Sequence, residues 1–321
     1  MRSLDSAYKA AVRDAERAQR RQERQLRQFD KELLLQEAEE EVQEYRDHVE
    51  RLKSLQEVTR ACVDWVAISS APEPREPTYS RQREIEATTR AREYKFSWID
   101  RLFKRQNTIR NRFETLIHLA IQEDKADFQR LTDSWVEEHH EWYLGTETAR
   151  GVLSGDPVSR GRALELANTF AEMTELGIRV SADASTKDGA AVDFEFEFNE
   201  LVPAEEKRLL KTGRVSAKRL TRTRYHGLCQ TIVCGCALRI ANDVLAILPD
   251  SKVLVTAVEV FVNKQTGHID NRTILSVFFT RTTMEALNME QLDPAECMVN
   301  FEHRMSFKPS TGFRPIERFT I

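Results

Sequence analysis

Residues 252–281 decide the fold class. Residues 252–263 read KVLVTAVEVFVN, residues 264–267 read KQTG, and residues 268–281 read HIDNRTILSVFFTR. β-branched and aromatic residues fill the two outer runs, and a short connection containing glycine is typical of a hairpin. Because both runs are apolar on both faces, we expect two central strands in a sheet that is covered on two sides.

A long apolar segment precedes this hairpin. It runs from Tyr225 to Leu248, and Pro249 stops any helix there. Small residues and three cysteines within it suit close packing. We therefore expect a helix that is buried against the sheet.

Three further segments complete the expected domain. Residues 178–198 alternate apolar and polar side chains around a turn at Lys187-Asp188-Gly189, which predicts a hairpin with one apolar and one acidic face. Asp293-Pro294 is a strong helix start, and residues 301–321 follow as an extended tail. The expected fold class is α+β, with a mainly antiparallel sheet and packed helices in the order β-β-α-β-β-α.

The N-terminal residues predict a long helix. Residues 4–60 contain no glycine or proline, and such a helix reaches roughly 80 Å at about 1.5 Å per residue. Its apolar side chains recur at heptad-like steps, with a phase slip near Leu33, at Leu4, Tyr8, Ala15, Ala18, Leu26, Phe29, Leu33, Ala38, Val42, Tyr45, Val49 and Leu52. Only another helix covers so narrow a stripe. We expect a coiled-coil homodimer through residues 4–60, and the alternative is packing on a later part of the same chain.

Prolines mark the clearest boundary. Pro72, Pro74 and Pro77 predict an extended connector, and residues 80–176 read as helical, with Asp124 as an N-cap of one helix. The expected regions are a coiled-coil arm, a proline-rich linker, a helical region and an α+β domain at residues 1–60, 61–79, 80–176 and 177–321.

Composition limits the class of protein. The 321 residues carry 48 Lys and Arg against 52 Asp and Glu, and the five cysteines are an odd number without metal-binding spacing. No signal peptide is evident in residues 1–30, and no stretch is long and uncharged enough to cross a bilayer. We expect a cytoplasmic protein with no membrane partner.

Four runs resemble a region that recurs in uncharacterised bacterial proteins. These runs are Val63–Ile68, Leu164–Phe170, Cys234–Ala241 and Lys252–Val258. The resemblance covers about residues 60–321 and implies a bacterial origin and a widely reused module, in a family with an N-terminal helical arm and a C-terminal α+β region. It implies no activity, because none is established for that family.

A basic stretch is the strongest functional signal. Eight cations fall within 18 residues, and no acid follows Glu206 in this stretch: Lys207, Arg208, Lys211, Arg214, Lys218, Arg219, Arg222 and Arg224. Such a patch binds phosphates with salt-dependent affinity. The alternative is a solvated linker, or a strip that neutralises the acidic strand Asp193–Glu197.

A metal-dependent nuclease site is the competing hypothesis. It needs two carboxylates and a lysine around a metal ion and an attacking water. The candidates are Asp193, Glu195, Glu259 and Lys264, although Phe261 occupies the position where such a motif has its lysine. An exposed acidic sheet face explains Asp193 and Glu195 more simply.

Other signals are weaker. His139-His140 on one helix point about 100° apart and do not predict a metal site, and Arg239 with Asp243 four residues later predicts an intrahelical ion pair or a pocket cation. No cofactor motif is present. The leading function is a non-enzymatic scaffold that oligomerises through its N-terminal helix and binds a protein or nucleic acid through its C-terminal domain. The alternative is a metal-dependent nuclease or nucleic-acid-processing enzyme.

Overall fold

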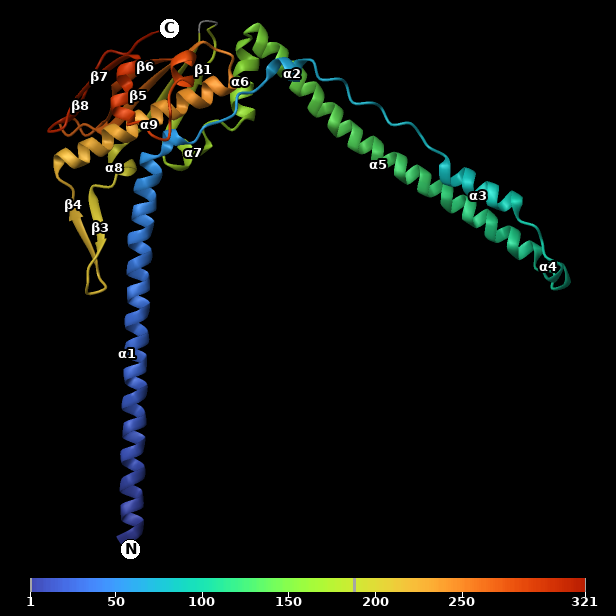
Figure 1. Cartoon of the computed structure of the whole chain (residues 1–321), viewed down its shortest axis with the longest axis horizontal. Coiled ribbons are helices and arrows are strands. Elements are labelled where there is room, and N and C mark those ends of the chain that lie inside the picture. The colour runs from blue at the N-terminus through green and yellow to red at the C-terminus, as the bar shows by residue number, and fades with distance from the viewer. Residues whose placement is uncertain (1, 187–188, 321) are drawn as a thin grey trace. The chain divides into compact units, whose positions relative to one another are not determined.

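The computed structural model describes residues 2–186 and 189–320, with side chains from residue 25 onward (Figure 1). Contacts divide the chain into a first unit, residues 1–63 and 160–321, and a second unit, residues 64–159. The proline-rich stretch therefore groups with the helices that follow it, and the arm groups with the α+β region. The predicted turn residues Lys187 and Asp188 lie outside the described residues.

The first unit contains a sheet, a two-stranded hairpin and several helices. Its elements are α1 (Arg2–Lys53), η1 (Leu55–Glu57), α6 (Pro157–Leu166), α7 (Ala171–Glu175), β1 (Arg179–Asp183), β2 (Ala190–Phe196), α8 (Phe198–Leu201), β3 (Glu205–Leu209), β4 (Val215–Arg219), α9 (Arg222–Ile247), β5 (Lys252–Val262), β6 (Ile269–Thr280), α10 (Arg281–Glu285), α11 (Pro294–Cys297), η2 (Met298–Asn300), β7 (Glu302–Lys308) and β8 (Gly312–Arg314). The class is α+β, as predicted.

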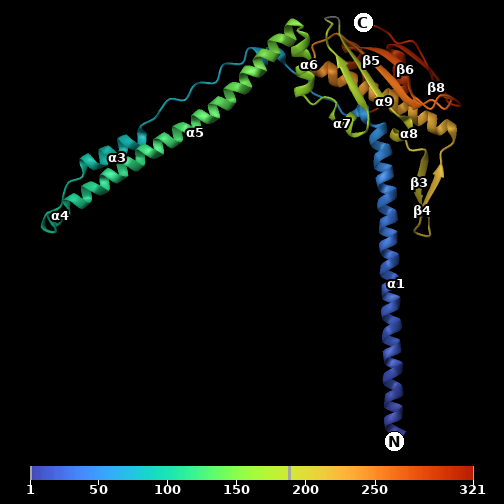
Figure 2. The ribbon, with the colours of Figure 1, turned by 180° about the vertical axis from the view of Figure 1, so that it is seen from behind.

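The main sheet is mixed. Its strand order is β1-β2-β5-β6-β7-β8, in which β2 and β5 are parallel and the other neighbours antiparallel. A parallel pair needs a crossover, and here the chain between β2 and β5 passes through β3, β4 and α9. The strands β5 and β6 are central, and residues 253–260 of β5 are buried on both faces. The helix α9 packs on one face of the sheet (Figure 2), and Phe319 contacts Ser276 and Phe278 on the other.

The helix α9 explains the long apolar segment. Among the described residues it is the one helix long and apolar enough to cross a membrane by length and composition, and 78% of its apolar window is buried inside the fold. Residues such as Ile232, Leu238 and Ile240 are fully buried. Its hydrophobicity therefore serves the core of the first unit.

Two segments form strands that the sequence did not indicate. Residues 199–220, expected as a connection, contain the separate hairpin β3–β4, and the expected extended tail contains β7 and β8. Charged residues have low strand propensity, so the sequence pattern of the first segment favoured a linker. The Thr212-Gly213 turn allows the chain to reverse between the two strands, with φ +75° at the glycine.

The apolar stripe of α1 divides into two parts. Ala38, Val42 and Leu52 are buried within the chain, where α1 contacts β3, β4 and α9. The alternative of packing within the chain therefore holds for this part of the stripe. Leu26, Phe29 and Leu33 remain exposed. The side chains of the stripe before residue 25 lie outside the described residues.

The second unit is built on one long helix. Its elements are α2 (Trp65–Ser69), α3 (Gln82–Glu93), α4 (Trp98–Leu102) and α5 (Gln106–Ser154). The helix α5 ends where Gly155 adopts the left-handed conformation, with φ +79°. The proline-rich segment lies along α5, because the indole N–H groups of Trp135 and Trp142 donate to the carbonyls of Pro74 and Ala71 at 3.0 and 2.8 Å.

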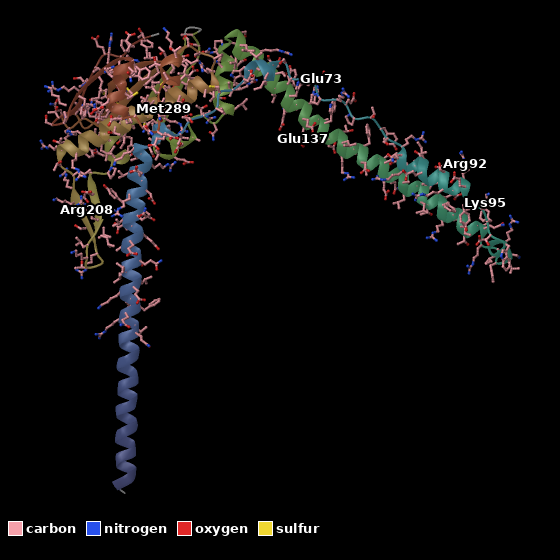
Figure 3. All side chains as sticks on the ribbon, viewed as in Figure 1. Glu73, Arg92, Lys95, Glu137, Arg208 and Met289 are labelled. Atoms are coloured by element: carbon pink, nitrogen blue, oxygen red, sulfur yellow. The ribbon has the colours of Figure 1, made fainter. Side chains whose placement is uncertain are left out.

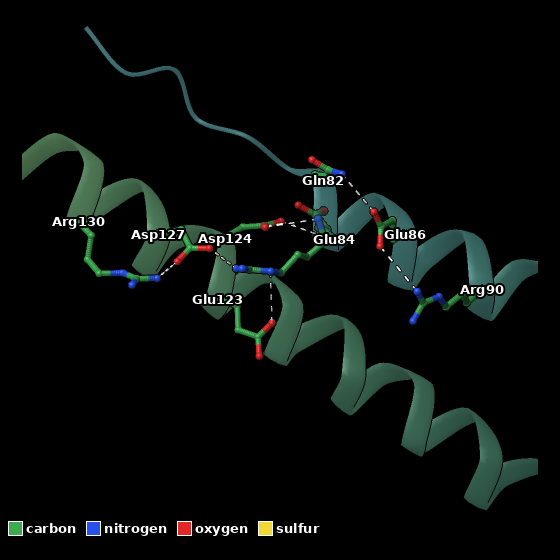
Figure 4. Close-up of polar contacts among 9 residues, drawn as sticks. Gln82, Glu84, Glu86, Arg90, Glu123, Asp124, Asp127 and Arg130 are labelled. Carbon is green, nitrogen blue, oxygen red and sulfur yellow. Dashed lines mark hydrogen bonds and ion pairs between the residues drawn. The ribbon is translucent and has the colours of Figure 1, made fainter. Parts of the chain in front are cut away.

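The predicted N-cap role of Asp124 within its own helix is wrong. Asp124 is buried inside α5, which continues through it because no glycine or proline interrupts the helix there. Its carboxylate instead accepts the backbone N–H groups of Arg83 and Glu84, at 3.4 and 3.0 Å (Figure 4). These are free donors at the start of α3, so Asp124 caps α3 from the neighbouring helix.

Candidate nucleic-acid interface

The basic stretch folds as a hairpin that α1 supports. The β3–β4 register pairs Glu205 with Arg219 and Leu209 with Val215. Lys207 forms an ion pair with Glu41 of α1 at 2.8 Å. At the turn, a Cβ added to Gly213 would lie 3.2 Å from a methyl group of Leu35, so the turn approaches α1 closely. Figure 1 and Figure 2 both show the hairpin beside α1.

Three of the eight predicted cations are paired with acids. Besides the Lys207 pair, Glu206 binds Arg208 at 2.8 Å and Arg224 at 3.2 Å. The hydrogen bond from Arg208 lowers the pKa of Glu206, and the hydrogen bond to Glu41 raises the pKa of Lys207. Since at least one partner of each pair is well exposed to solvent, water screens the pair and it contributes little to stability.

The other five cations are exposed and, within the described part of the chain, form no ion pair: Lys211, Arg214, Lys218, Arg219 and Arg222. They lie on the turn, on β4 and at the first residue of α9. The structure therefore brings the unpaired positive charge of this stretch onto the hairpin turn, β4 and the start of α9.

A pocket of about 500 Å³ adjoins these cations. Its polar lining comes from β4, the start of α9 and the turn between β7 and β8, through Arg219, Arg222, Tyr225, His226, Ser310 and Thr311. Two guanidinium groups and two hydroxyl groups are suited to a phosphate.

Two contacts fix the wall of this pocket. The imidazole Nδ1 of His226 lies 2.8 Å from the Pro309 carbonyl oxygen. Because a carbonyl only accepts, Nδ1 carries the hydrogen. Gly312, with φ +77°, lets the β7–β8 turn approach this ring, since a Cβ there would lie 3.2 Å from its Cδ2. Burial raises the pKa of Tyr225, so its hydroxyl keeps its proton near neutral pH.

A larger pocket, of about 600 Å³, lies between α1 and the base of the hairpin. Its lining mixes both signs of charge, with Arg46, Lys53 and Arg224 beside Asp47, Glu50 and Glu206. Since these charges offset one another, this pocket adds no net attraction for an anion.

The candidate nuclease residues do not converge. In the β2–β5 register Asp193 pairs with Thr256 and Phe196 pairs with Glu259, so the two carboxylates point to opposite faces of the sheet. Glu195 lies on the same face as Asp193, and Lys264 lies in the turn after β5. A site that holds one metal ion between Asp193 and Glu259 is therefore not formed.

Each candidate carboxylate has an arginine instead. Asp193 pairs with Arg318 at 2.8 Å, Glu195 with Arg179 at 3.2 Å, and Glu259 with Arg272 at 2.7 Å. Burial raises the pKa of Glu259, and Arg272 opposes that shift. Among the described residues no group of three potential metal ligands gathers, and His139 pairs with Glu73 at 3.0 Å.

Comparisons with protein families, with curated proteins and with solved structures found no match to this chain. The resemblance to uncharacterised bacterial proteins and the cytoplasmic location therefore stay predictions.

Sequence reasoning found the cations but missed the pocket. Ser310 and Thr311 belong to a Pro-Ser-Thr-Gly run that signals a turn. Nothing local shows that this turn lies beside α9, because the contact joins residues more than 80 positions apart in the chain, such as His226 and Pro309.

Proposed function

We propose that this chain is a non-enzymatic assembly protein that binds the phosphate backbone of nucleic acid through β3–β4 and the start of α9. One observation carries the proposal. Among the described side chains, five exposed cations without acidic partners gather on one hairpin and helix start, in a chain whose formal net charge is −4. This hairpin therefore carries a local excess of positive charge, although the chain as a whole is slightly negative.

The shape of the hairpin favours a duplex. A two-stranded ribbon fits the major groove of DNA, and lysine and arginine side chains pair with phosphates. The pocket beside Arg219 and Arg222 offers a place for one phosphate group. We assign no base-reading contact, so the expected binding depends little on sequence and strongly on salt.

Neutralising the hairpin tests this function. The full chain with K211Q, R214Q, K218Q and R219Q is expected to bind a fluorescein-labelled 20-base-pair DNA at least tenfold more weakly in fluorescence anisotropy. Each lost phosphate contact removes about 0.9 from the slope of log affinity against log salt concentration, so that slope becomes shallower by up to about 4. A matched control with K125Q, R150Q, R162Q and K264Q removes four exposed cations elsewhere. Equal affinity in the two variants contradicts the proposal.

The scaffold part of the proposal rests on α1. Leu26, Phe29 and Leu33 follow a heptad-like spacing and are exposed, whereas the later stripe is covered by β3, β4 and α9. A second copy of α1 offers the same stripe, so a coiled-coil dimer buries both. This dimer would place two basic hairpins on one particle.

Light scattering tests the dimer. Wild-type protein is expected at twice the chain mass, and F29E with L33E is expected at the mass of one chain, because charges at the seam repel and oppose burial. Q25E with Q28E adds the same charge on the same helix and is expected to stay dimeric. A wild-type mass of one chain, about 37 kDa, would show that α1 does not dimerise.

A further inference from the structure

The end of the second unit exposes large apolar side chains. The turn between α3 and α5 contains α4, where Trp98, Leu102 and Phe103 are 72%, 66% and 62% exposed, and Ile99 and Tyr94 are also exposed. Soluble proteins rarely leave so many large apolar groups together in water without an interaction to serve. We call residues 94–105 the α4 turn.

The α4 turn is a fixed structure. Ser97 Oγ accepts a hydrogen bond from the Ile99 N–H, and the Asp100 carboxylate accepts one from the Ser97 N–H at 2.9 Å. Together these bonds form a capping box at the N-terminus of α4. The Tyr94 ring packs on Phe113 of α5, with centroids 5.2 Å apart. Lys104 has φ 50° and turns the chain into α5. The fixed backbone of the α4 turn therefore keeps these apolar side chains exposed to solvent.

Cations surround this apolar group. Residues 90–112 contain eight lysines and arginines against two acids, and all eight are exposed: Arg90, Arg92, Lys95, Arg101, Lys104, Arg105, Arg110 and Arg112. Within the described residues Arg90 pairs with Glu86, and no ion pair involves the other seven. Figure 3 shows Arg92 and Lys95 at this end of α3.

We propose that the α4 turn binds the surface of an anionic membrane. Tryptophan with aliphatic side chains partitions to the boundary between headgroups and acyl chains, and lysine and arginine around them attract acidic headgroups. The apolar residues lie at a turn at the end of a helix pair, which is the part of the unit able to enter a flat surface. This proposal differs from the sequence-based expectation that no membrane is a partner.

Vesicle flotation with the full chain tests the proposal. The protein is expected to float with vesicles of phosphatidylcholine containing 30% phosphatidylserine, and at least tenfold less with pure phosphatidylcholine. The variant W98S with F103S, and separately K95Q with R101Q, K104Q and R105Q, are each expected to reduce flotation at least tenfold. L131S with V136S removes two exposed apolar side chains from the middle of α5 and is expected to float as the wild type does.

Further measurements test whether the α4 turn itself causes the vesicle binding. Trp98 emission is expected to shift to the blue on anionic vesicles, and a W98F variant is expected to float while losing most of that shift. The hairpin variant with four glutamines is expected to float normally, so failure here and failure of nucleic-acid binding are distinguishable. Absence of flotation, equal flotation with both vesicles, or loss in the hairpin variant alone overturns the proposal. If W98S with F103S lowered the particle mass in light scattering and the wild-type protein did not bind vesicles, the proposal would be overturned. The α4 turn would then bind a second copy of the chain.

Discussion

Replacing Asp250 with asparagine is expected to lower the free energy of unfolding of the first unit by about 3–5 kcal/mol. Arg160 donates from Nη1 and Nη2 to the two oxygens of Asp250, both at 2.7 Å, and from Nε to the Ala184 carbonyl at 3.0 Å. Both side chains are only 3% exposed. The substitution leaves the Arg160 guanidinium buried without its counter-charge, so the desolvation cost of that charge is no longer offset. Hydrogen exchange of β5 amides measures the loss.

A double substitution separates the pair from simple packing. R160M with D250L removes both charges, so it is expected to cost clearly less than either single change. Glu195→Gln breaks the exposed pair with Arg179 and is expected to cost no more than about 1 kcal/mol. If the double variant lost as much stability as the two single variants combined, the pair would not be the source of the effect.

Local patterns predicted the centre of the first unit. The apolar runs at residues 252–263 and 268–281 gave β5 and β6, because a strand that is buried on both faces has an apolar sequence on both faces. The spacing of Arg239 and Asp243 predicted an ion pair within one helix, and Nε lies 2.7 Å from Oδ2. These features depend on neighbours a few residues apart.

Features that depend on distant residues could not be predicted in this way. The parallel pairing of β2 with β5 joins segments about 60 residues apart, and Asp124 caps a helix that begins about 40 residues earlier. The hairpin β3–β4 forms in a charged sequence because α1 packs against it. For the candidate interface, sequence identified all eight cations, and only the structure separated those with acidic partners from those without.

Arg239 holds the buried carboxylate of Asp243 in α9, with Nε at 2.7 Å from Oδ2. Arg239→Met is expected to lower the free energy of unfolding at pH 7.5 by up to about 3–5 kcal/mol. It removes the hydrogen-bonded partner of the buried Asp243 carboxylate, and also the ion pair of Arg239 with Glu172 at 3.3 Å. Asp243 is 3% exposed. Its remaining neighbours are Arg60, at 3.7 Å, and Glu172, whose negative charge opposes ionisation of Asp243. Urea unfolding gives the free energy of unfolding at each pH, and hydrogen exchange of α9 amides shows whether α9 is the part that is destabilised.

The sign of the pH effect follows from the pKa of Asp243. Burial raises this pKa above its ordinary value of 3.8, although the hydrogen bond from Arg239 opposes the rise. Between pH 3.8 and the folded pKa, the folded chain holds a proton that the unfolded chain has released. This group's contribution to stability is therefore full below pH 3.8 and is lost as pH rises through the folded pKa. Without Arg239 the folded pKa rises further. The loss caused by Arg239→Met is thus expected to shrink as pH falls from 7.5 towards 4, and R239M with D243N is expected to cost the same at every pH. A pH-independent loss in the single variant would show that packing of the arginine stem, rather than its charge, stabilises α9.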